Sequence, residues 1–430
     1  MKINNAGNYI NLKFFVILYL LITVIFYNKF IFDTVSSKLP IIFFALIFGC
    51  HFIQKLILGE PFSPHVTKIP SVVPFMITFL MLEIAHAIFD INEFISVITI
   101  CGLLLFVRYT ARRCKEEMIF ILSSLCSVYL ITIYCMCLFS GMVGVDLSSP
   151  GSFITQFLPF LGPWVVNDSF LSGRGSFSLV GGILAIIMMF RIRESGANFS
   201  SIFFVFMGTL FILLSDSRSS LVCFVIIVLL IYSPLPHHTK NRLFFAFPLF
   251  ILIFQLYPLL MSDLLESAKQ VLLLNRQGMS EELNRATAAA ESLRLIKASL
   301  LHSLFGYGSF GAAKALEVAI LQVYTAETLD SAHNMMLQIL LEGGIVLASI
   351  FYLMFVRFYL VAARFIKHFG SVDLDAIAAL NYTILGGMTG SILSISRVNE
   401  SMTVFVLCII AVNMQIKQME YSLTDRLYYS

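Results

Sequence analysis

Charge is scarce in this sequence of 430 residues. Aspartate, glutamate, lysine and arginine together make up 12% of the chain, whereas a typical soluble domain has about 25%. Apolar residues, by contrast, make up 59%. This number of charged groups is too small to cover the water-exposed surface of a soluble protein. The composition therefore excludes an ordinary soluble protein.

The sequence also lacks motifs for a metal ion, a nucleotide or a disulfide framework. HExxH, EF-hand and P-loop patterns are all missing, so we predict neither a metal nor any other cofactor. Seven of the eight cysteines fall in apolar runs and the eighth, Cys114, lies in a basic stretch. None is therefore placed to form a disulfide bond within a long outer loop. The net charge of +3 gives no reason to expect nucleic acid as a partner.

Long apolar runs recur from one end of the chain to the other. Many approach twenty residues, which is long enough to cross about 30 Å of hydrocarbon as an α-helix. We predict an all-α, polytopic integral membrane protein with about twelve spans in one transmembrane domain, residues 1–430. The spans are expected at 14–32, 38–54, 71–89, 94–107, 118–140, 176–190, 200–216, 219–233, 243–260, 334–356, 375–395 and 401–416. The first run is too long for a signal peptide and is expected to be retained.

Basic residues are concentrated in alternate connections between the predicted spans. They are Arg108, Arg112, Arg113, Lys115, Arg191, Arg193, Lys240, Arg242, Arg364, Lys367, Lys417 and Arg426. The opposite short connections are acidic or nearly neutral. By the positive-inside rule, the basic connections and both termini are cytoplasmic. Arg218, His333 and the longest polar segment then face outward.

Two outer segments are too polar or too interrupted to span a membrane. The first covers residues 141–175, where Pro159 and Pro163 interrupt an apolar stretch that ends at Arg174. Trp164 suits the boundary between lipid and water. We therefore expect this segment to lie at the depth of the lipid headgroups.

The second outer segment is a long loop, residues 261–333. Apolar residues recur at three- and four-residue steps between 280 and 301, which predicts an amphipathic helix. The side chains expected on its buried face are Leu293, Ile296 and Leu300, and those expected in water are Asn284 and Glu291. We expect this helix to close over a site as a lid, with hinges at Gly278, Gly306 and Gly308.

Arginines are candidates for binding an anionic substrate. Arg218 opens a span within "SDSRSS", and Arg276, Arg285 and Arg294 lie in the long loop. Each also has an ordinary explanation, because Arg218 could anchor a helix end at the interface and a single loop arginine is commonly a solvated charge. The serines around Arg218 favour a functional role for it.

Histidine and glutamate candidates are expected on the same outer side. His333, followed by Asn334, opens a span directly after the loop and is a candidate general base. A histidine at a helix start is, however, more often a cap or a surface residue, and His302 is a competing imidazole. Glu83, one turn before His86, is a carboxylate at membrane depth. Such a residue suggests a functional site unless water or an arginine binds the carboxylate.

Three of these features, taken together, resemble a known family. A serine–arginine pair opens a span in "LLSDSRSSLVCFVI", an arginine-bearing loop helix leads to Gly-x-Gly in "SLRLIKASLLHSLFGYGSFG", and His-Asn opens the next span in "SAHNMMLQILLEGG". In this order they resemble the O-antigen ligase and O-antigen polymerase family over roughly residues 170–360. The spacing from Arg285 to Gly306 is longer than is typical, and Ser303 stands where proline is usual, so either Arg285 or Arg294 fills the loop-arginine position.

The resemblance implies a metal-independent glycosyltransferase at the outer face of a bacterial inner membrane. Its donor would be a glycan linked to an undecaprenyl-diphosphate-type lipid. The implied catalytic residues are His333, Arg218 and Arg285, and the residues implied to bind the diphosphate or the glycan are Arg294, Arg174, Gly306, Gly308 and Asn334. Expected partners are membrane lipids, and a chain-length regulator and a flippase of the same pathway.

The identity of the acceptor stays open at this point. A polymerase extends the glycan on its lipid carrier, whereas a ligase transfers it to the lipid A core. We favour a polymerase, because the loop is modest and only mildly basic, whereas a ligase must also bind a heavily phosphorylated acceptor. A transporter or flippase would bind the same lipid without chemistry, but the sequence shows no internal repeat to support it. A peptidoglycan-type polymerase is more remote, since its catalytic residue is an aspartate.

Overall fold

The computed structural model of the full chain describes most of its central and C-terminal parts. The described residues are 72–88, 97, 100–101, 115–139, 143–144, 158–166, 174–215, 217–256, 280–321, 332, 334–388 and 400–429. The spans predicted at 14–32 and 38–54 lie outside these residues, as does most of the span predicted at 94–107.

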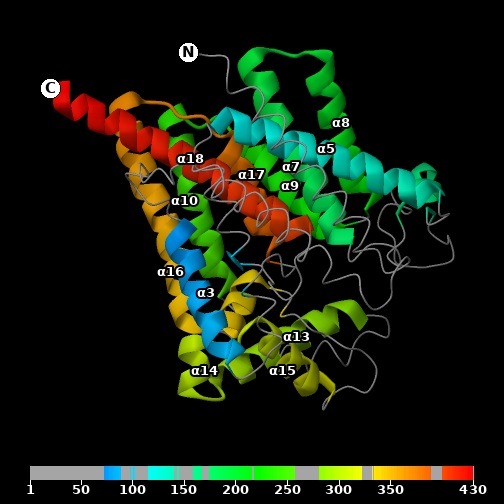
Figure 1. The fold of residues 1–430 in the computed structure, drawn as a ribbon. Helices are drawn as coiled ribbons and strands as arrows, with labels where there is room; N and C mark the ends of the chain where they lie inside the picture. Colours follow the sequence, from blue (N-terminus) through cyan, green and yellow to red (C-terminus); the bar gives the residue numbers. More distant parts are fainter. Residues whose placement is uncertain are drawn as a thin grey trace, which may run out of the picture.

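Helices dominate the described part of the chain (Figure 1). In order they are α3 (Val72–Ala87), α5 (Lys115–Phe139), the 3-10 helix η1 (Pro159–Trp164), α7 (Arg174–Ser195), α8 (Phe199–Leu214), α9 (Arg218–Tyr232), α10 (His237–Gln255), α13 (Ser280–Lys297), α14 (Leu300–Phe305), α15 (Ser309–Leu321), α16 (Met335–Phe369), α17 (Asp375–Gly386) and α18 (Glu400–Tyr429). Extended pairing in these ranges is confined to one isolated bridge, between Val143 and Val166. The predicted all-α class is confirmed for this part of the chain.

The predicted spans coincide with helices wherever the structure describes the segment. Nine of the twelve fall on α3, α5, α7, α8, α9, α10, α16, α17 and α18. Of these, α5, α16 and residues Val404–Thr424 of α18 are long and apolar enough to cross a membrane, and α3, α8 and α9 are shorter apolar helices. The total of twelve spans stays a prediction.

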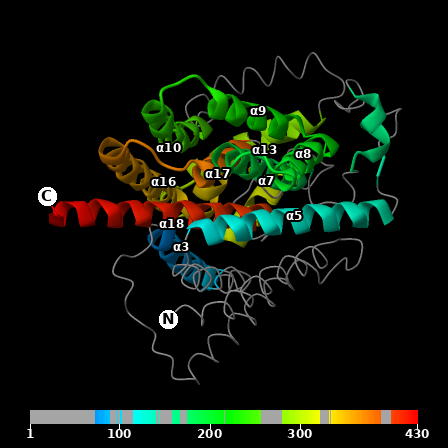
Figure 2. The ribbon, with the colours of Figure 1, turned by 90° about the horizontal axis from the view of Figure 1, so that it is seen from above.

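Two long helices divide the molecule when it is seen from above. α18 and α5 run across it nearly in line, with α3 on one side and α7, α8, α9, α10, α16 and α17 on the other (Figure 2). α17 is central, because its residues from Asp375 to Leu385 are all buried. α7 and α8 pack backbone to backbone, since a β-carbon on Gly208 would lie 2.5 Å from the carbonyl oxygen of Gly181. Small residues allow membrane helices to approach this closely.

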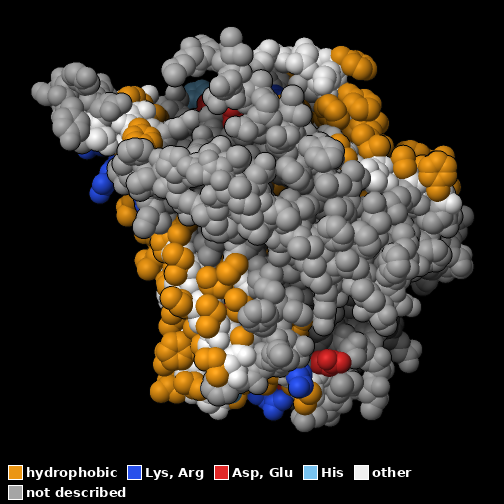
Figure 3. Space-filling view, in the orientation of Figure 1, with side chains coloured by type: hydrophobic (Ala, Val, Ile, Leu, Met, Phe, Trp, Pro, Cys, Tyr) orange, Lys and Arg blue, Asp and Glu red, His pale blue; other side chains and the backbone are white. Residues whose placement is uncertain are grey.

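An apolar surface covers α3 and α16. Its exposed side chains include Met81 on α3 and Ile345 and Leu353 on α16, and apolar atoms follow these helices in the space-filling view (Figure 3). Soluble monomers rarely expose an apolar patch of this extent. This surface fits contact with lipid tails.

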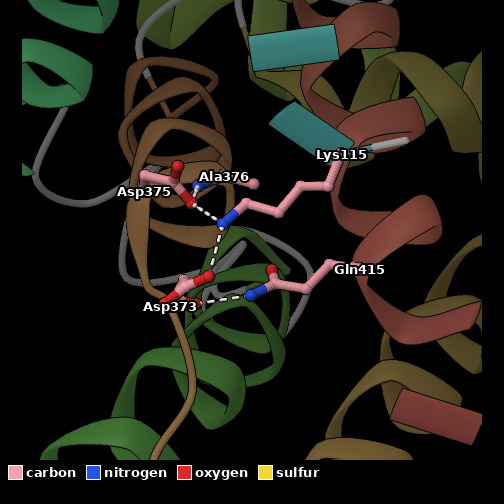
Figure 4. Close-up of polar contacts among 5 residues, drawn as sticks. All are labelled: Lys115, Asp373, Asp375, Ala376 and Gln415. Atoms are coloured by element: carbon pink, nitrogen blue, oxygen red, sulfur yellow. Dashed lines mark hydrogen bonds and ion pairs between the residues drawn. The ribbon is translucent and has the colours of Figure 1, made fainter. Parts of the chain in front are cut away.

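One end of the bundle collects basic residues that the sequence analysis places in the cytoplasm. Lys115 Nζ, at the start of α5, lies 2.7 Å from Asp375 Oδ1 and 3.1 Å from Asp373 Oδ2 (Figure 4). Lys240 Nζ, on α10, donates to the carbonyl oxygen of Ile231 at 3.0 Å. Lys240 and Asp373 line one cavity, so the end of α9 and the starts of α5, α10 and α17 lie together at what we call the basic end.

The opposite end carries the start of α9. Arg218 begins this helix and Ile231 lies close to its end, so the two backbone positions are about 20 Å apart. Val166 N donates to the carbonyl oxygen of Leu214 at 2.9 Å. The described residues 158–166 of the predicted interfacial segment, which include η1, therefore lie beside the turn that leads from α8 to Arg218.

The long helix α16 is broken near its start. Gly344 has non-helical torsion angles (φ 65°, ψ −168°), so a short first part is followed by a long second part. At the break, the carbonyl oxygen of Leu341 accepts a hydrogen bond from Tyr307 N at 2.9 Å. The carbonyl oxygen of Glu342 accepts one from Gly308 N, also at 2.9 Å. Irregular backbone is tolerated at membrane depth where protein groups satisfy it, and the whole first part of α16 is buried.

The amphipathic helix predicted at 280–301 is in fact two helices. α13 ends at Lys297, and Ser299 caps a new helix, α14, by accepting a hydrogen bond from His302 N at 3.1 Å. A serine at this position competes with helix continuation, because its side chain satisfies the first N–H groups of the next helix. The sequence periodicity alone did not reveal this boundary.

The buried face of α13 is partly as predicted. Leu293 and Ile296 are buried. Leu300, predicted to join them, is 77% exposed, because it starts α14 and no longer follows the stripe on α13. Glu291 was predicted in water, but its side chain is only 14% exposed and pairs with Arg294.

Candidate functional site

Arg218 is the first residue of α9, and hydroxyl groups fix this helix start to α7. Ser217 Oγ and Ser178 Oγ both donate to Ser220 Oγ, at 2.9 and 2.7 Å. Arg218 itself is an exposed residue. Arg174, at the start of α7, has its backbone in the described part of the chain but not its side chain.

Tyr382 connects α17 to the same helix start. Its hydroxyl lies 3.1 Å from the carbonyl oxygen of Ser178 and 3.4 Å from that of Ser220. The ring fills the space over Gly182, where a β-carbon would collide with it. Tyr382 was not among the residues predicted from the sequence, because a tyrosine in an apolar run carries no signal of its own.

His333 lies outside the described residues, but both of its neighbours are held in place. Ala332 N donates to Gln338 Oε1 at 2.8 Å. Asn334 caps α16 by accepting a hydrogen bond from Leu337 N at 3.0 Å, which is a preferred role of asparagine at a helix start.

Gln255, the last residue of α10, is buried and joins three helices. Its Nε2 donates to the carbonyl oxygen of Ile384 on α17 at 2.8 Å. Its Oε1 accepts from Met336 N on α16 at 3.3 Å. Its own carbonyl oxygen accepts from Asn334 Nδ2 at 3.2 Å. This one side chain and its backbone therefore fix the start of α16 against α10 and α17.

The last turns of α17 connect the start of α9 with the start of α16. Tyr382 contacts the first of these helices. Gly387, just beyond α17, accepts a hydrogen bond from Met335 N at 2.8 Å. We call the segment Tyr382–Gly387, together with the residues hydrogen-bonded to it, the α17 junction. Its two ends are about 8 Å apart along a helix axis, so it ties the arginine-bearing helix closely to the residues beside His333.

α13 lies against the residues that flank His333. Leu293 forms a small apolar cluster with Ala332 and Leu337. Tyr307, just after α14, donates from its hydroxyl to the carbonyl oxygen of Leu295 at 3.1 Å. The helix that carries the loop arginines is therefore packed over the start of α16.

The two loop arginines on α13 occupy different faces of it. Arg294 Nε lies 2.7 Å from Glu291 Oε2, and its side chain is 61% exposed. The backbone of Arg285 belongs to α13, whereas its side chain lies outside the described atoms. By helical periodicity, position 285 shares a face with Ser292 and Ile296, and both of these are buried. Arg276 lies outside the described residues.

Gly306 and Gly308 pack on the break in α16. Both have positive φ angles, of 74° and 77°. A β-carbon on Gly306 would collide with the carbonyl group of Glu342, and one on Gly344 would collide with the backbone of Leu304. Close contact between two backbones therefore requires glycine here. The predicted roles of Gly306 and Gly308 in substrate binding and as hinges stay predictions.

Two buried carboxylates lie beside this contact. Ser309 Oγ is 2.9 Å from Glu83 Oε1 and 3.5 Å from Glu342 Oε2. Ser309 N is 3.1 Å from Glu83 Oε1, so one partner of Glu83 is a serine on α15. Gln338 Nε2 donates to Glu342 Oε1 at 2.7 Å. The described part of the chain has no group of three His, Cys, Asp or Glu side chains placed to hold a metal ion.

His302 has a packing role in the turn before Gly306. Its ring stacks on Tyr307 with the ring centroids 3.8 Å apart, and its Nδ1 lies 2.9 Å from Ser299 Oγ. Burial, and then the positive potential of nearby His86, lower the pKa of His302. A neutral, stacked ring accounts for this histidine without a role in chemistry.

Comparison with known proteins identifies one region of the chain. Residues 202–352 match the family model described as "O-Antigen ligase". No curated protein and no solved structure matches the chain. The matched region runs from α8 into α16. Of the predicted site residues it contains Arg218, Arg285, Arg294, Gly306, Gly308, His333 and Asn334, but not Arg174.

Proposed function

We propose, on the premise that residues 202–352 belong to the O-antigen ligase family, that this chain is a membrane glycosyltransferase. Its donor is a glycan on a polyisoprenyl diphosphate. Its product is a longer glycan on the same type of carrier, of the O-antigen or capsule kind. The chain is therefore proposed to be a polymerase of lipid-linked repeat units.

The α17 junction is the observation that carries this proposal. It fixes the start of α9, with Arg218, and the start of α16, beside His333, to one short piece of helix. A glycosyl transfer needs a cation at the leaving phosphate and a base at the acceptor, held in a fixed relation to each other. The two sequence positions are more than a hundred residues apart, and the fold brings their helix starts to the same junction.

Arginine suits the leaving group of this reaction. Negative charge grows on the diphosphate as the bond from the anomeric carbon to phosphate oxygen breaks. Without a divalent ion, a guanidinium can stabilise this charge through paired hydrogen bonds. We assign this role to Arg218 and to Arg285, because position 285 shares a face with buried residues of α13 whereas Arg294 is exposed and paired with Glu291. Arg294, Arg174, Gly306 and Gly308 are proposed to bind the diphosphate or the glycan, and Asn334 to hold the start of α16 beside them.

His333 is proposed as the general base. The hydroxyl group of the acceptor sugar attacks the anomeric carbon, its proton moves to the imidazole, and the lipid diphosphate leaves with the electron pair of the broken bond. An imidazole with an ordinary pKa near 6.5 can accept a proton at neutral pH. The neighbouring hydrogen bonds of Ala332 and Asn334 restrict the backbone on both sides of this residue.

A ligase is the second candidate, and the description of the matching family favours it. A ligase uses the same donor chemistry but transfers the glycan to the lipid A core. The acceptor of a ligase carries several phosphates, so its site needs additional cations. α13 and α14 together carry three cations, Arg285, Arg294 and Lys297, and so small a number supports the polymerase.

The proposed location is the inner membrane of a bacterium, with both termini in the cytoplasm and the α17 junction toward the periplasm. The cations at the basic end support this orientation through the positive-inside rule. A flippase must then supply the lipid-linked unit on the outer side, and a chain-length regulator is a further proposed partner. Membrane lipids contact the apolar surface over α3 and α16.

Purified protein incubated with lipid-linked repeat units tests the function. Longer glycans that remain on the polyisoprenyl diphosphate are expected. Transfer only to added lipid A core would make the protein a ligase, and movement of unchanged units across a vesicle membrane would make it a transporter. His333→Ala should lower the rate of product formation by about 100- to 10,000-fold, which leaves a measurable residual rate, while the protein still inserts and accumulates normally. Full activity of that variant would refute the assignment of the base.

The metal-independent part of the proposal is tested in the same assay. Activity should persist in excess EDTA, because arginine side chains are assigned the role that a divalent ion plays elsewhere. Loss of activity in EDTA that magnesium restores would contradict this assignment.

A further inference from the structure

A continuous series of buried polar contacts leads from α3 to the residue before His333. Glu83 on α3 accepts from the N–H and the hydroxyl group of Ser309 on α15. The hydroxyl of Ser309 also lies within 3.5 Å of Glu342 on α16. Glu342 accepts from Gln338 Nε2 at 2.7 Å, and Gln338 Oε1 accepts from Ala332 N at 2.8 Å.

Chemistry fixes the orientation of the Gln338 amide within this path. A backbone N–H can only donate, so the group of Gln338 that faces Ala332 N must be an acceptor. Gln338 therefore has to direct its oxygen toward Ala332 and its NH₂ group toward Glu342, and the observed contacts have this polarity. Because Gln338 and Glu342 are one helical turn apart, the carboxylate holds the amide along the axis of α16.

The path is completely inside the protein. The side chains of Glu83, Ser309, Gln338 and Glu342 are all buried. Buried polar groups are costly unless each has partners, and here each supplies a partner to the next. A loss of Gln338 would leave a buried N–H at Ala332 and a carboxylate oxygen without the hydrogen bonds that they now make.

Ala332 is the last described residue before His333, and Asn334 follows it. Asn334 is held by its cap on α16 and by Gln255. Gln338 supplies the corresponding restraint on the other side, at Ala332. The chain is therefore restrained on both sides of position 333.

We propose that Gln338 and Glu342 are positioning residues for His333, and that the buried path from Glu83 and Ser309 anchors them. This inference rests on the proposed function of His333 as the general base. Gln338 does not touch the substrate; it orients the segment that carries the base. A displacement of a catalytic group by about 1 Å is enough to reduce a rate by about 100-fold, so loss of this restraint acts mainly on turnover.

The first experiment measures the restraint without any substrate. Hydrogen exchange of the peptide that contains Ala332 is followed by mass spectrometry in wild type, Gln338→Leu and Gln415→Leu. Gln415→Leu is the matched control, because Gln415 is also buried and donates to a backbone oxygen, that of Asp373, at the basic end. Exchange at Ala332 should accelerate in Gln338→Leu alone. Unchanged exchange there would overturn the restraint.

The second experiment measures glycan synthesis. Gln338→Leu should lower kcat by about 10- to 100-fold with the KM for the donor within about twofold, and Gln415→Leu should retain wild-type kcat. Glu342→Gln keeps an acceptor oxygen for Gln338 Nε2, so it should retain more activity than Glu342→Leu. A larger effect on the KM for the donor than on kcat would overturn the positioning role.

A double mutant separates this inference from the proposed function. In a His333→Ala background, Gln338→Leu should cause no further loss, because it acts through His333. Losses that multiply would show that Gln338 acts independently, which refutes the inference. Different observations would refute the proposed function itself: wild-type protein would make no glycan, or His333→Ala would retain full activity.

Discussion

At the scale of single residues, Arg218 tests whether a positive charge alone is enough to bind the diphosphate or whether a planar guanidinium is needed. Lysine would preserve the positive charge at the start of α9, but an ammonium group cannot form the paired, planar hydrogen bonds that guanidinium makes with a phosphate. We expect Arg218→Lys to lose activity nearly as completely as Arg218→Ala, by more than about 100-fold in kcat/KM. Product length and rate with lipid-linked repeat units measure this.

The matched control for this prediction is Arg242→Lys. Arg242 is an exposed arginine on α10 and should tolerate lysine without loss of activity. Normal chain length in Arg218→Lys would show that Arg218 acts as a simple point charge or as an interface anchor. Substitution by lysine or by alanine should lower glycan synthesis more at Arg285 than at Arg294, because Arg294 is exposed and paired with Glu291.

His302 gives a prediction about pH. Its pKa in the folded protein is lowered by burial and by His86, below an unfolded value of about 6.5. Its contribution to stability is therefore fully present above about pH 6.5 and is lost as the pH falls through the folded pKa. The midpoint of thermal unfolding in detergent should fall between pH 7.5 and pH 5.5, and fall less in His302→Phe, which keeps an aromatic ring against Tyr307.

Glycan synthesis should separate His302 from His333. His302→Phe should retain most of its activity, since the ring of His302 is stacked and its Nδ1 is engaged by Ser299. The control for the pH effect is His238→Phe, an exposed position on α10 that should show the wild-type dependence. Loss of synthesis in His302→Phe with normal protein amount would move the catalytic assignment to His302.

At the scale of elements, the contact between the Gly306 turn and the break in α16 leaves no space for a β-carbon. Gly306→Ala places a β-carbon against the carbonyl group of Glu342 at a positive φ angle. The conformational cost is about 1–3 kcal/mol, and overpacking adds at least about 1 kcal/mol. Thermal unfolding and glycan synthesis should both be reduced.

Gly370→Ala is the control that separates the two costs. Gly370 also has a positive φ angle, of 82°, but a β-carbon there meets nothing within 4 Å. It should lose only the conformational part, so it should remain more stable than Gly306→Ala and keep its activity. Equal destabilisation of the two variants would mean that the backbone contact contributes nothing to stability.

The same elements show how far sequence reasoning reached. The length of the apolar runs located the helices, because a helix needs that length to cross a bilayer. The three motifs resemble a family whose model matches residues 202–352. The break at Gly344 was missed, since two consecutive glycines in an apolar run fit ordinary helix packing. Its partners, Tyr307 and Gly308, are distant in sequence, and only the fold brings them together.

The sequence predicted some residues of the candidate site and missed others, because many of them act through contacts between distant helices. Arg218 and Asn334 are visible because charged or capping residues stand at the edge of apolar runs. Gln338 and Glu342 carried a usable signal, because polar side chains four residues apart in an apolar helix need partners, but they were not singled out. Tyr382 and Gln255 act through single contacts to other helices, and no periodicity marks them.

At the scale of the whole molecule, the polar and charged contacts described above lie at the two ends of the bundle. The basic end has short ion pairs, such as Lys115 with Asp373 and Asp375, which join helix ends. The opposite end has the α17 junction and the broken helix. The apolar surface over α3 and α16 lies between them (Figure 3). This division is what a membrane enzyme needs when its substrate has a lipid tail and a charged headgroup.

Orientation in the membrane follows from this division and can be measured directly. Single cysteines are placed in a background whose native cysteines have been replaced, at Ala298 beside α14 and at Ser195 at the end of α7, both exposed positions. Cells with a permeabilised outer membrane are then treated with a maleimide that cannot cross the inner membrane. Ala298→Cys should be labelled at once, and Ser195→Cys only after the inner membrane is disrupted, because cations at the basic end resist translocation. The reverse pattern would put the α17 junction in the cytoplasm, where a lipid-linked unit delivered to the outer side by a flippase could not reach Arg218.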